Sequence, residues 1–99
     1  MNGRNKNDIV SRIPKKEHKV WHKMRRLEQG DKRLLWQFIQ ESNKENVIIY
    51  EGKHSQLTNL LNERLIVKNP IYQPRKKELS LFILPEAPYL IRILNREYN

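Results

Sequence analysis

Two histidines four residues apart, His18 and His22, are side chains whose spacing could support metal chemistry. On a helix this spacing places both rings on one face, where they could share one metal ion. Glu17 stands before the first histidine, so the metalloprotease order H-E-x-x-H is not met, and no third ligand is nearby in the sequence. Two solvated histidines on a basic helix are the simpler interpretation, and we expect no metal site.

A cationic cluster surrounds Trp21. Basic side chains on a helix can contact phosphates, and each neutralised phosphate releases counterions, which makes binding sensitive to salt. The alternative is a solvated helix that only keeps a small protein soluble. The candidate phosphate contacts are Lys15, Lys16, Lys19, Lys23, Arg25 and Arg26.

Two further polar groups fit a nucleic acid. Arg75, Lys76 and Lys77 form the tip of an expected hairpin, where they could enter a minor groove or lie along a phosphate backbone. Charges at that place also discourage edge-to-edge pairing of strands, and this second interpretation is the more economical one. Gln56 and Asn59 could pair with adenine in a major groove, although polar residues on the outer face of any amphipathic helix look the same.

The composition limits the possible functions. The 99 residues carry 20 Lys+Arg, 11 Asp+Glu and no Cys, which gives a formal net charge of +9. Disulfides, thiol catalysis and cysteine zinc sites are therefore excluded. No Ser/His/Asp set, paired-carboxylate cleft or glycine-rich phosphate loop can be assembled from the sequence, so we expect neither an enzyme nor a cofactor.

The charge is concentrated at the start of the chain. Residues 1–33 hold 11 Lys+Arg and 4 Asp+Glu, and therefore +7 of the total +9. This asymmetry predicts a basic segment attached to a nearly neutral folded unit. We expect residues 1–13 to form a flexible basic tail, because residues 1–12 contain few apolar side chains. Residues 14–99 are expected to form one domain, with a basic first helix at 15–28 and a core at 31–97.

The hydrophobic spacing predicts the order helix, helix, strand, helix, strand, strand, helix. The first helix follows Pro14 and stops at Gly30, and Asp31 is expected to cap the second. This order, with a small antiparallel sheet and a basic hairpin, is an α+β, winged-helix-like plan. The expected segments are helices at 15–28, 32–42, 54–65 and from Pro85 onward, and strands at 47–50, 66–72 and 78–84.

Six apolar residues are expected to be mostly buried around the strand at 47–50, because they fall on the apolar faces of these elements. They are Leu35, Phe38, Leu57, Leu61, Ile83 and Leu90.

Three segments carry a family resemblance: Leu27-x4-Lys32-x-Leu34-Leu35-x2-Phe38-Ile39, Leu57-x2-Leu60-Leu61-x3-Leu65-Ile66-Val67 and Leu81-Phe82-Ile83-Leu84-Pro85-Glu86-Ala87-x-Tyr89-Leu90. In this order they resemble the soluble C-terminal domain of the superinfection exclusion protein B family, over roughly residues 27–95. That family typically carries two membrane-spanning helices before this domain, where this chain has a basic segment. The position before Leu65-Ile66 is often Gly in the family and is Arg64 here. The resemblance implies the fold and transfers no catalytic residue.

Two classes of function follow as expectations. The first is a cytoplasmic, non-enzymatic protein that binds nucleic acid, duplex DNA above all, through phosphate contacts as an accessory or regulatory factor. The second is a protein-interaction module of a phage-exclusion or mobile-element system, as the resemblance implies. Peripheral attachment of the basic first helix to an anionic membrane is a third interpretation, and it predicts shallow, salt-labile binding.

Overall fold

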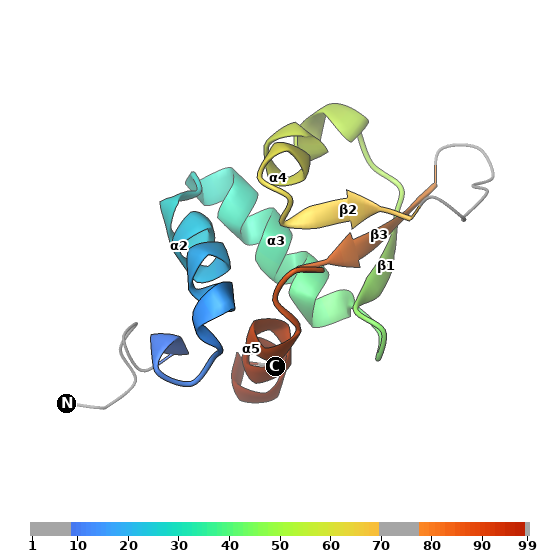
Figure 1. Cartoon of the computed structure of the whole chain (residues 1–99). Helices are drawn as coiled ribbons and strands as arrows, with labels where there is room; N and C mark the ends of the chain where they lie inside the picture. The colour runs from blue at the N-terminus through green and yellow to red at the C-terminus, as the bar shows by residue number, and fades with distance from the viewer. Residues whose placement is uncertain (1–8, 70–77, 99) are drawn as a thin grey trace.

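The computed structural model describes residues 9–69 and 78–98. Within them the chain is an α+β fold with four α-helices, two short 3₁₀ helices and a three-stranded antiparallel sheet (Figure 1). The elements are η1 (Lys15–Glu17), α2 (His18–Arg26), α3 (Gln29–Glu41), β1 (Val47–Tyr50), η2 (His54–Leu57), α4 (Thr58–Asn62), β2 (Ile66–Lys68), β3 (Leu79–Ile83) and α5 (Pro88–Tyr98).

The break between α2 and α3 falls earlier than the sequence predicts. Leu27 and Glu28 have extended backbone, with ψ of 152° and 161°, and Gly30 lies inside the first turn of α3. Asp31 does not cap this helix, because it is the third residue inside α3 and Glu28 holds the N-cap position. Its carboxylate accepts a hydrogen bond from Asn59 Nδ2 at 3.0 Å. The predicted Gly30 stop and Asp31 cap are therefore wrong, and a contact between α3 and α4 holds the carboxylate instead.

The sheet has the strand order β1-β3-β2, and both pairings are antiparallel. The central strand β3 places Val47 opposite Phe82 and Ile66 opposite Ile83. The predicted strand Val47–Tyr50 is confirmed over its whole length, and β2 and β3 lie within the two extended segments predicted after it. The predicted hairpin tip lies outside the described residues.

The third predicted helix, at 54–65, is shorter than expected and consists of η2 followed by α4. It ends in a Schellman motif, in which the Arg64 N–H donates to the Leu61 carbonyl and the Leu65 N–H donates to the Leu60 carbonyl, both at 3.0 Å. The motif requires one residue in the left-handed backbone conformation, and Arg64 adopts it with φ 60° at a position where glycine is usual. The side chain of Arg64 forms an exposed ion pair with Glu86.

Replacing Arg64 with Gly is expected to raise the free energy of unfolding by about 0.5–1 kcal/mol, because glycine adopts a positive φ without the steric cost of a Cβ atom. Arg64→Ala is the matched control, since it removes the same exposed ion pair and keeps the Cβ atom. Thermal and urea unfolding of both variants measure the difference. An Arg64→Gly protein no more stable than Arg64→Ala would contradict this account of the turn.

Helix α5 lacks a capping side chain of its own. It begins at Pro88, whose ring has no N–H to satisfy, and Ala87 precedes it. The predicted start of this helix at Pro85 is wrong, because the helix begins three residues later. The fully buried carboxylate of Glu17 caps the helix from outside, because its Oε2 accepts from the Tyr89 N–H at 3.2 Å and its Oε1 accepts from the Leu90 N–H at 2.8 Å.

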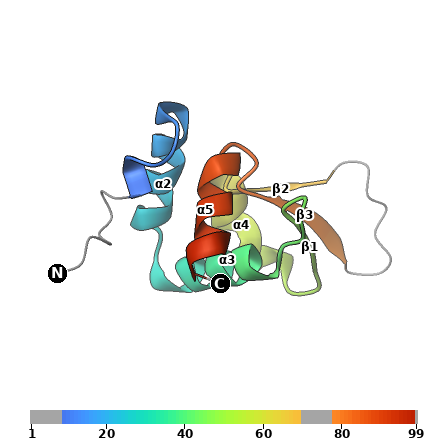
Figure 2. The ribbon, with the colours of Figure 1, turned by 90° about the horizontal axis from the view of Figure 1, so that it is seen from below.

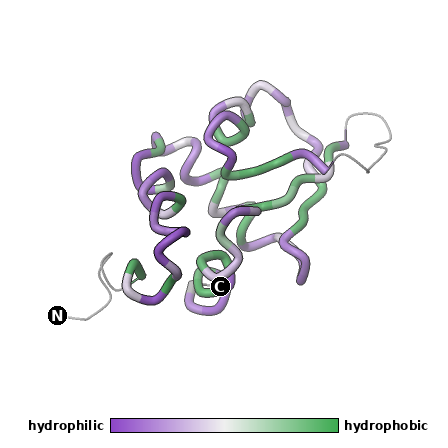
Figure 3. Tube along the Cα trace, in the orientation of Figure 1, coloured by the Kyte–Doolittle hydropathy of each residue, from purple (hydrophilic) through white to green (hydrophobic). Residues whose placement is uncertain are grey.

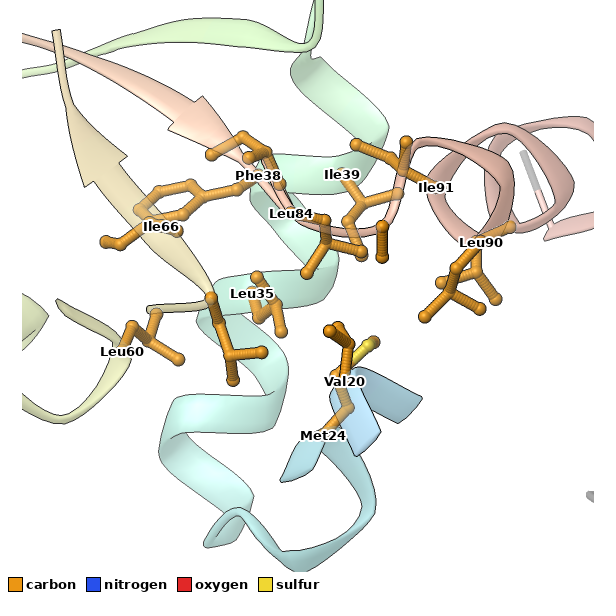
Figure 4. Packing of buried hydrophobic residues seen from close by; sticks show 14 of the residues in the cluster. Val20, Met24, Leu35, Phe38, Ile39, Leu60, Ile66, Leu84, Leu90 and Ile91 are labelled. Carbon is orange, nitrogen blue, oxygen red and sulfur yellow. The ribbon is translucent and has the colours of Figure 1, made fainter. Parts of the chain in front are cut away.

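One hydrophobic core joins the helices to the sheet. Helices α3 and α5 lie in the middle of the molecule (Figures 1 and 2). Helix α2 lies on one side of them, and the sheet lies on the other. Side chains from α2, α3, α4, β2 and α5 converge between them (Figure 4). Five of the six residues predicted in the core are buried: Leu35, Phe38, Leu57, Ile83 and Leu90. Leu61 is only partly buried, and its neighbour Leu60 is the fully buried residue of α4.

The start of the described chain also differs from the prediction of a flexible tail over 1–13. Ile9 and Ile13 are 5% and 7% exposed and belong to the core. Arg12 forms an ion pair with Glu97 of α5. Residues 9–13 are therefore packed against the domain, because two isoleucines four positions apart find apolar partners that the local sequence does not reveal. The remainder of the predicted tail lies outside the described residues.

Candidate nucleic-acid interface

The outer face of α2 is cationic because the helix buries its opposite face. Val20, Trp21 and Met24 are buried, and their spacing leaves the residues between them to solvent. Lys19, His22 and Arg26 occupy the opposite side at i, i+3 and i+7, and all three are exposed. Figure 3 shows hydrophilic residues gathered along α2 and hydrophobic residues along the strands. We call Lys19, His22 and Arg26 the α2 outer face.

Three other predicted cations border this face. Lys15 and Lys16 lie in η1, immediately before α2, and both are exposed. Arg25 is exposed on the flank of α2 beside Trp21. The described structure therefore brings five of the six predicted cations of residues 15–26 to the solvent on and around one helix.

Lys23 differs from the others because it has an intramolecular role. Its side chain is half-buried, and Nζ donates a hydrogen bond to the carbonyl oxygen of Glu63 at 3.1 Å. Glu63 follows the last residue of α4, where carbonyl groups carry partial negative charge. Lys23 thus links α2 to the end of α4, and a substitution there removes this contact as well as a surface charge.

The two residues proposed to read bases are also engaged within the protein. Gln56 lies in η2, and its Oε1 accepts a hydrogen bond from the Tyr50 hydroxyl at 3.0 Å. Asn59 lies in α4 and donates to Asp31. Both side chains are exposed, but bidentate pairing with adenine would require these bonds to break. Arg75, Lys76 and Lys77 lie outside the described residues.

The histidine pair is not brought together with a third ligand. His18 is half-buried, and its Nε2 lies 3.3 Å from the Ile13 carbonyl, to which it donates. His22 is exposed on the α2 outer face. Among residues 9–69 and 78–98, no group of three His, Cys, Asp or Glu side chains is placed to hold a metal ion.

The two tryptophans lie at or next to the core. Trp21 is buried, and Trp36 is half-buried against the cluster. Sequence reasoning missed the role of Glu17, because an acid within a run of charged residues gives no sign that it accepts hydrogen bonds from N–H groups 72 and 73 residues later.

Comparison with known proteins adds no relative. No protein-family model, curated protein or solved structure matches the chain. In the part of the chain that the structure describes, no helix has the length and apolar character needed to cross a membrane.

Proposed function

We propose that the protein binds nucleic acid, duplex DNA above all, as a non-enzymatic accessory or regulatory factor that contacts phosphates through α2. The observation that carries this proposal is the α2 outer face. Lys19 and Arg26 are exposed on one side of a helix of nine residues, with Lys15 and Lys16 exposed just before it. Exposed cations grouped on and just before one helix can contact a backbone that carries one negative charge per about 1.7 Å of duplex axis.

The arrangement of the core elements supports the proposal. Helix α3, strand β1, the η2–α4 segment and the pair β2–β3 follow one another, with strand order β1-β3-β2. We propose that this is a winged-helix-like domain, as the sequence resemblance implies. Only residues 51–65 separate β1 from β2, and they hold a 3₁₀ turn and a five-residue helix. A full helix-turn-helix does not fit there, so the proposal assigns the phosphate contacts to α2.

Contacts of this kind predict affinity that is governed by salt and depends little on sequence. With about four phosphates contacted, the slope of log affinity against log salt is expected to be roughly −3 to −4. Fluorescence anisotropy with labelled duplex and single-stranded DNA, from low to physiological salt, measures this slope. The double variant Lys19→Ala/Arg26→Ala is expected to weaken binding to all duplexes alike and to flatten the slope by up to about two units.

The matched control is Lys44→Ala/Lys53→Ala, which removes the same charge from exposed positions before and after β1. If this control weakens binding as much as the α2 variant, net charge alone drives the association and the α2 outer face is not the site. Absence of DNA binding at low salt would contradict the proposal. Equal binding to anionic vesicles would favour a membrane surface as the partner instead.

A further inference from the structure

A small apolar pocket lies between α2 and α3, on the flank of the α2 outer face. Its volume is about 180 Å³. A cavity of about 150 Å³ with apolar walls is large enough to hold a benzene ring. The pocket thus has room for one aromatic ring and little more. Its apolar lining consists of Trp21, Met24, Leu27, Leu35 and Trp36.

The polar part of the lining is cationic. Arg25 of α2 and Lys32 of α3 complete it, and no Asp or Glu of the described residues lines the pocket. Arg25 is exposed and Lys32 is half-buried, so both positive charges are placed where apolar walls meet solvent. An occupant that brings one negative charge would pair with them, whereas a neutral or cationic occupant would not.

Trp21, which forms part of the pocket wall, carries a buried side-chain donor. Trp21 Nε1 is buried and has no hydrogen-bond partner among the described residues. A buried tryptophan N–H usually finds an acceptor, because leaving it unpaired costs free energy. Because Nε1 is not accessible to solvent, this N–H lies beneath the pocket surface, and recognition of an occupant rests on the apolar walls and on the two cations.

We propose that this pocket binds a small aromatic carboxylate. The ring occupies the apolar space between the two tryptophans, and the carboxylate faces Arg25 and Lys32. This site does not rest on the proposed function: Lys19 and Arg26 of the α2 outer face do not line the pocket, and Arg25 borders both surfaces.

The test uses three probes that separate the ring from the charge. Phenylacetate carries both, phenylacetamide carries the ring without the charge, and acetate carries the charge without the ring. The chain has 2 Trp residues, so the two indole N–H signals in a ¹⁵N correlation spectrum report on the pocket directly. Phenylacetate is expected to shift the Trp21 signal saturably and to bind at least about tenfold tighter than either of the other probes.

The variants Arg25→Ala and Lys32→Ala are each expected to weaken phenylacetate binding at least about threefold and to leave phenylacetamide binding unchanged. Their neighbours Arg26 and Arg33 do not line the pocket, so Arg26→Ala and Arg33→Ala are matched controls. Equal binding of phenylacetate and phenylacetamide would overturn the proposal. So would an unshifted Trp21 signal at saturating phenylacetate, or an equal loss in the control variants.

Discussion

Replacing Leu60 with Ala is expected to lower the free energy of unfolding by about 2–5 kcal/mol. Leu60 is fully buried in the core, so truncation removes apolar contacts and leaves a cavity that the surrounding helices fill only in part. A loss of this size is a large fraction of the stability of a small domain, which is about 5–15 kcal/mol. Urea and thermal unfolding followed by circular dichroism measure it.

The adjacent Leu61 provides the control. Leu61→Ala deletes the same atoms from the same five-residue helix, so the effect on helix propensity is alike in both variants. Because Leu61 is only partly buried, its truncation is expected to cost about 1 kcal/mol or less. Equal losses for the two variants would mean that α4 does not face the core through Leu60.

The pair Leu60 and Leu61 also shows where sequence reasoning reached its limit in this fold. Apolar spacing predicted a helix in this region and a leucine in the core, but both leucines fit the same stripe. The side that packs depends on how η2 turns into α4 and on the left-handed Arg64 that ends the helix. That geometry is set by tertiary contacts, and periodicity alone does not contain it.

Patterns within one element were predicted most successfully. The β-branched run Val47–Tyr50 is a strand over its full length, and the stripe of α3 buries Leu35, Phe38 and Ile39. Contacts between distant segments were missed. Ile9 packs in the core, but most residues of the segment 1–12 are polar, and Ile9 was therefore assigned to a tail.

For the candidate site, too, the sequence predicted local features and missed contacts between distant segments. A concentration of cations is visible in the sequence, and the structure exposes most of it on and around α2. Which cations are available to a partner depends on contacts that the sequence does not reveal. Lys23 is used to hold the end of α4, and Asn59 is used to hold Asp31. The apolar pocket combines residues of α2, α3 and the break between them, so its cationic rim became visible only once the break was located.

The capping of α5 by Glu17 leads to the other large prediction. Glu17→Ala removes the acceptor of the buried Leu90 N–H and of the part-buried Tyr89 N–H at the start of α5. Bonds to a charged acceptor and the favourable field of the helix N-terminus are lost together, so the expected cost is about 2–5 kcal/mol. For a domain of this length that is a fall in Tm of roughly 10–30 °C.

Two further variants distinguish the loss of the Glu17 cap from the loss of Glu17 packing. Glu45→Ala removes an acid from an exposed loop position and is expected to change stability by less than about 0.5 kcal/mol. Ala87 precedes α5, and its carbonyl accepts the first helical bond from Ile91, so a serine there would occupy the N-cap position. If Glu17 acts as the cap, Ala87→Ser is expected to restore about 1 kcal/mol in the Glu17→Ala background. In the wild-type protein, whose donors are already satisfied, the same serine is expected to lower the stability, because Ala87 is fully buried and the added hydroxyl gains no partner. If the serine has the same effect in both backgrounds, the carboxylate of Glu17 is not what stabilises the start of α5.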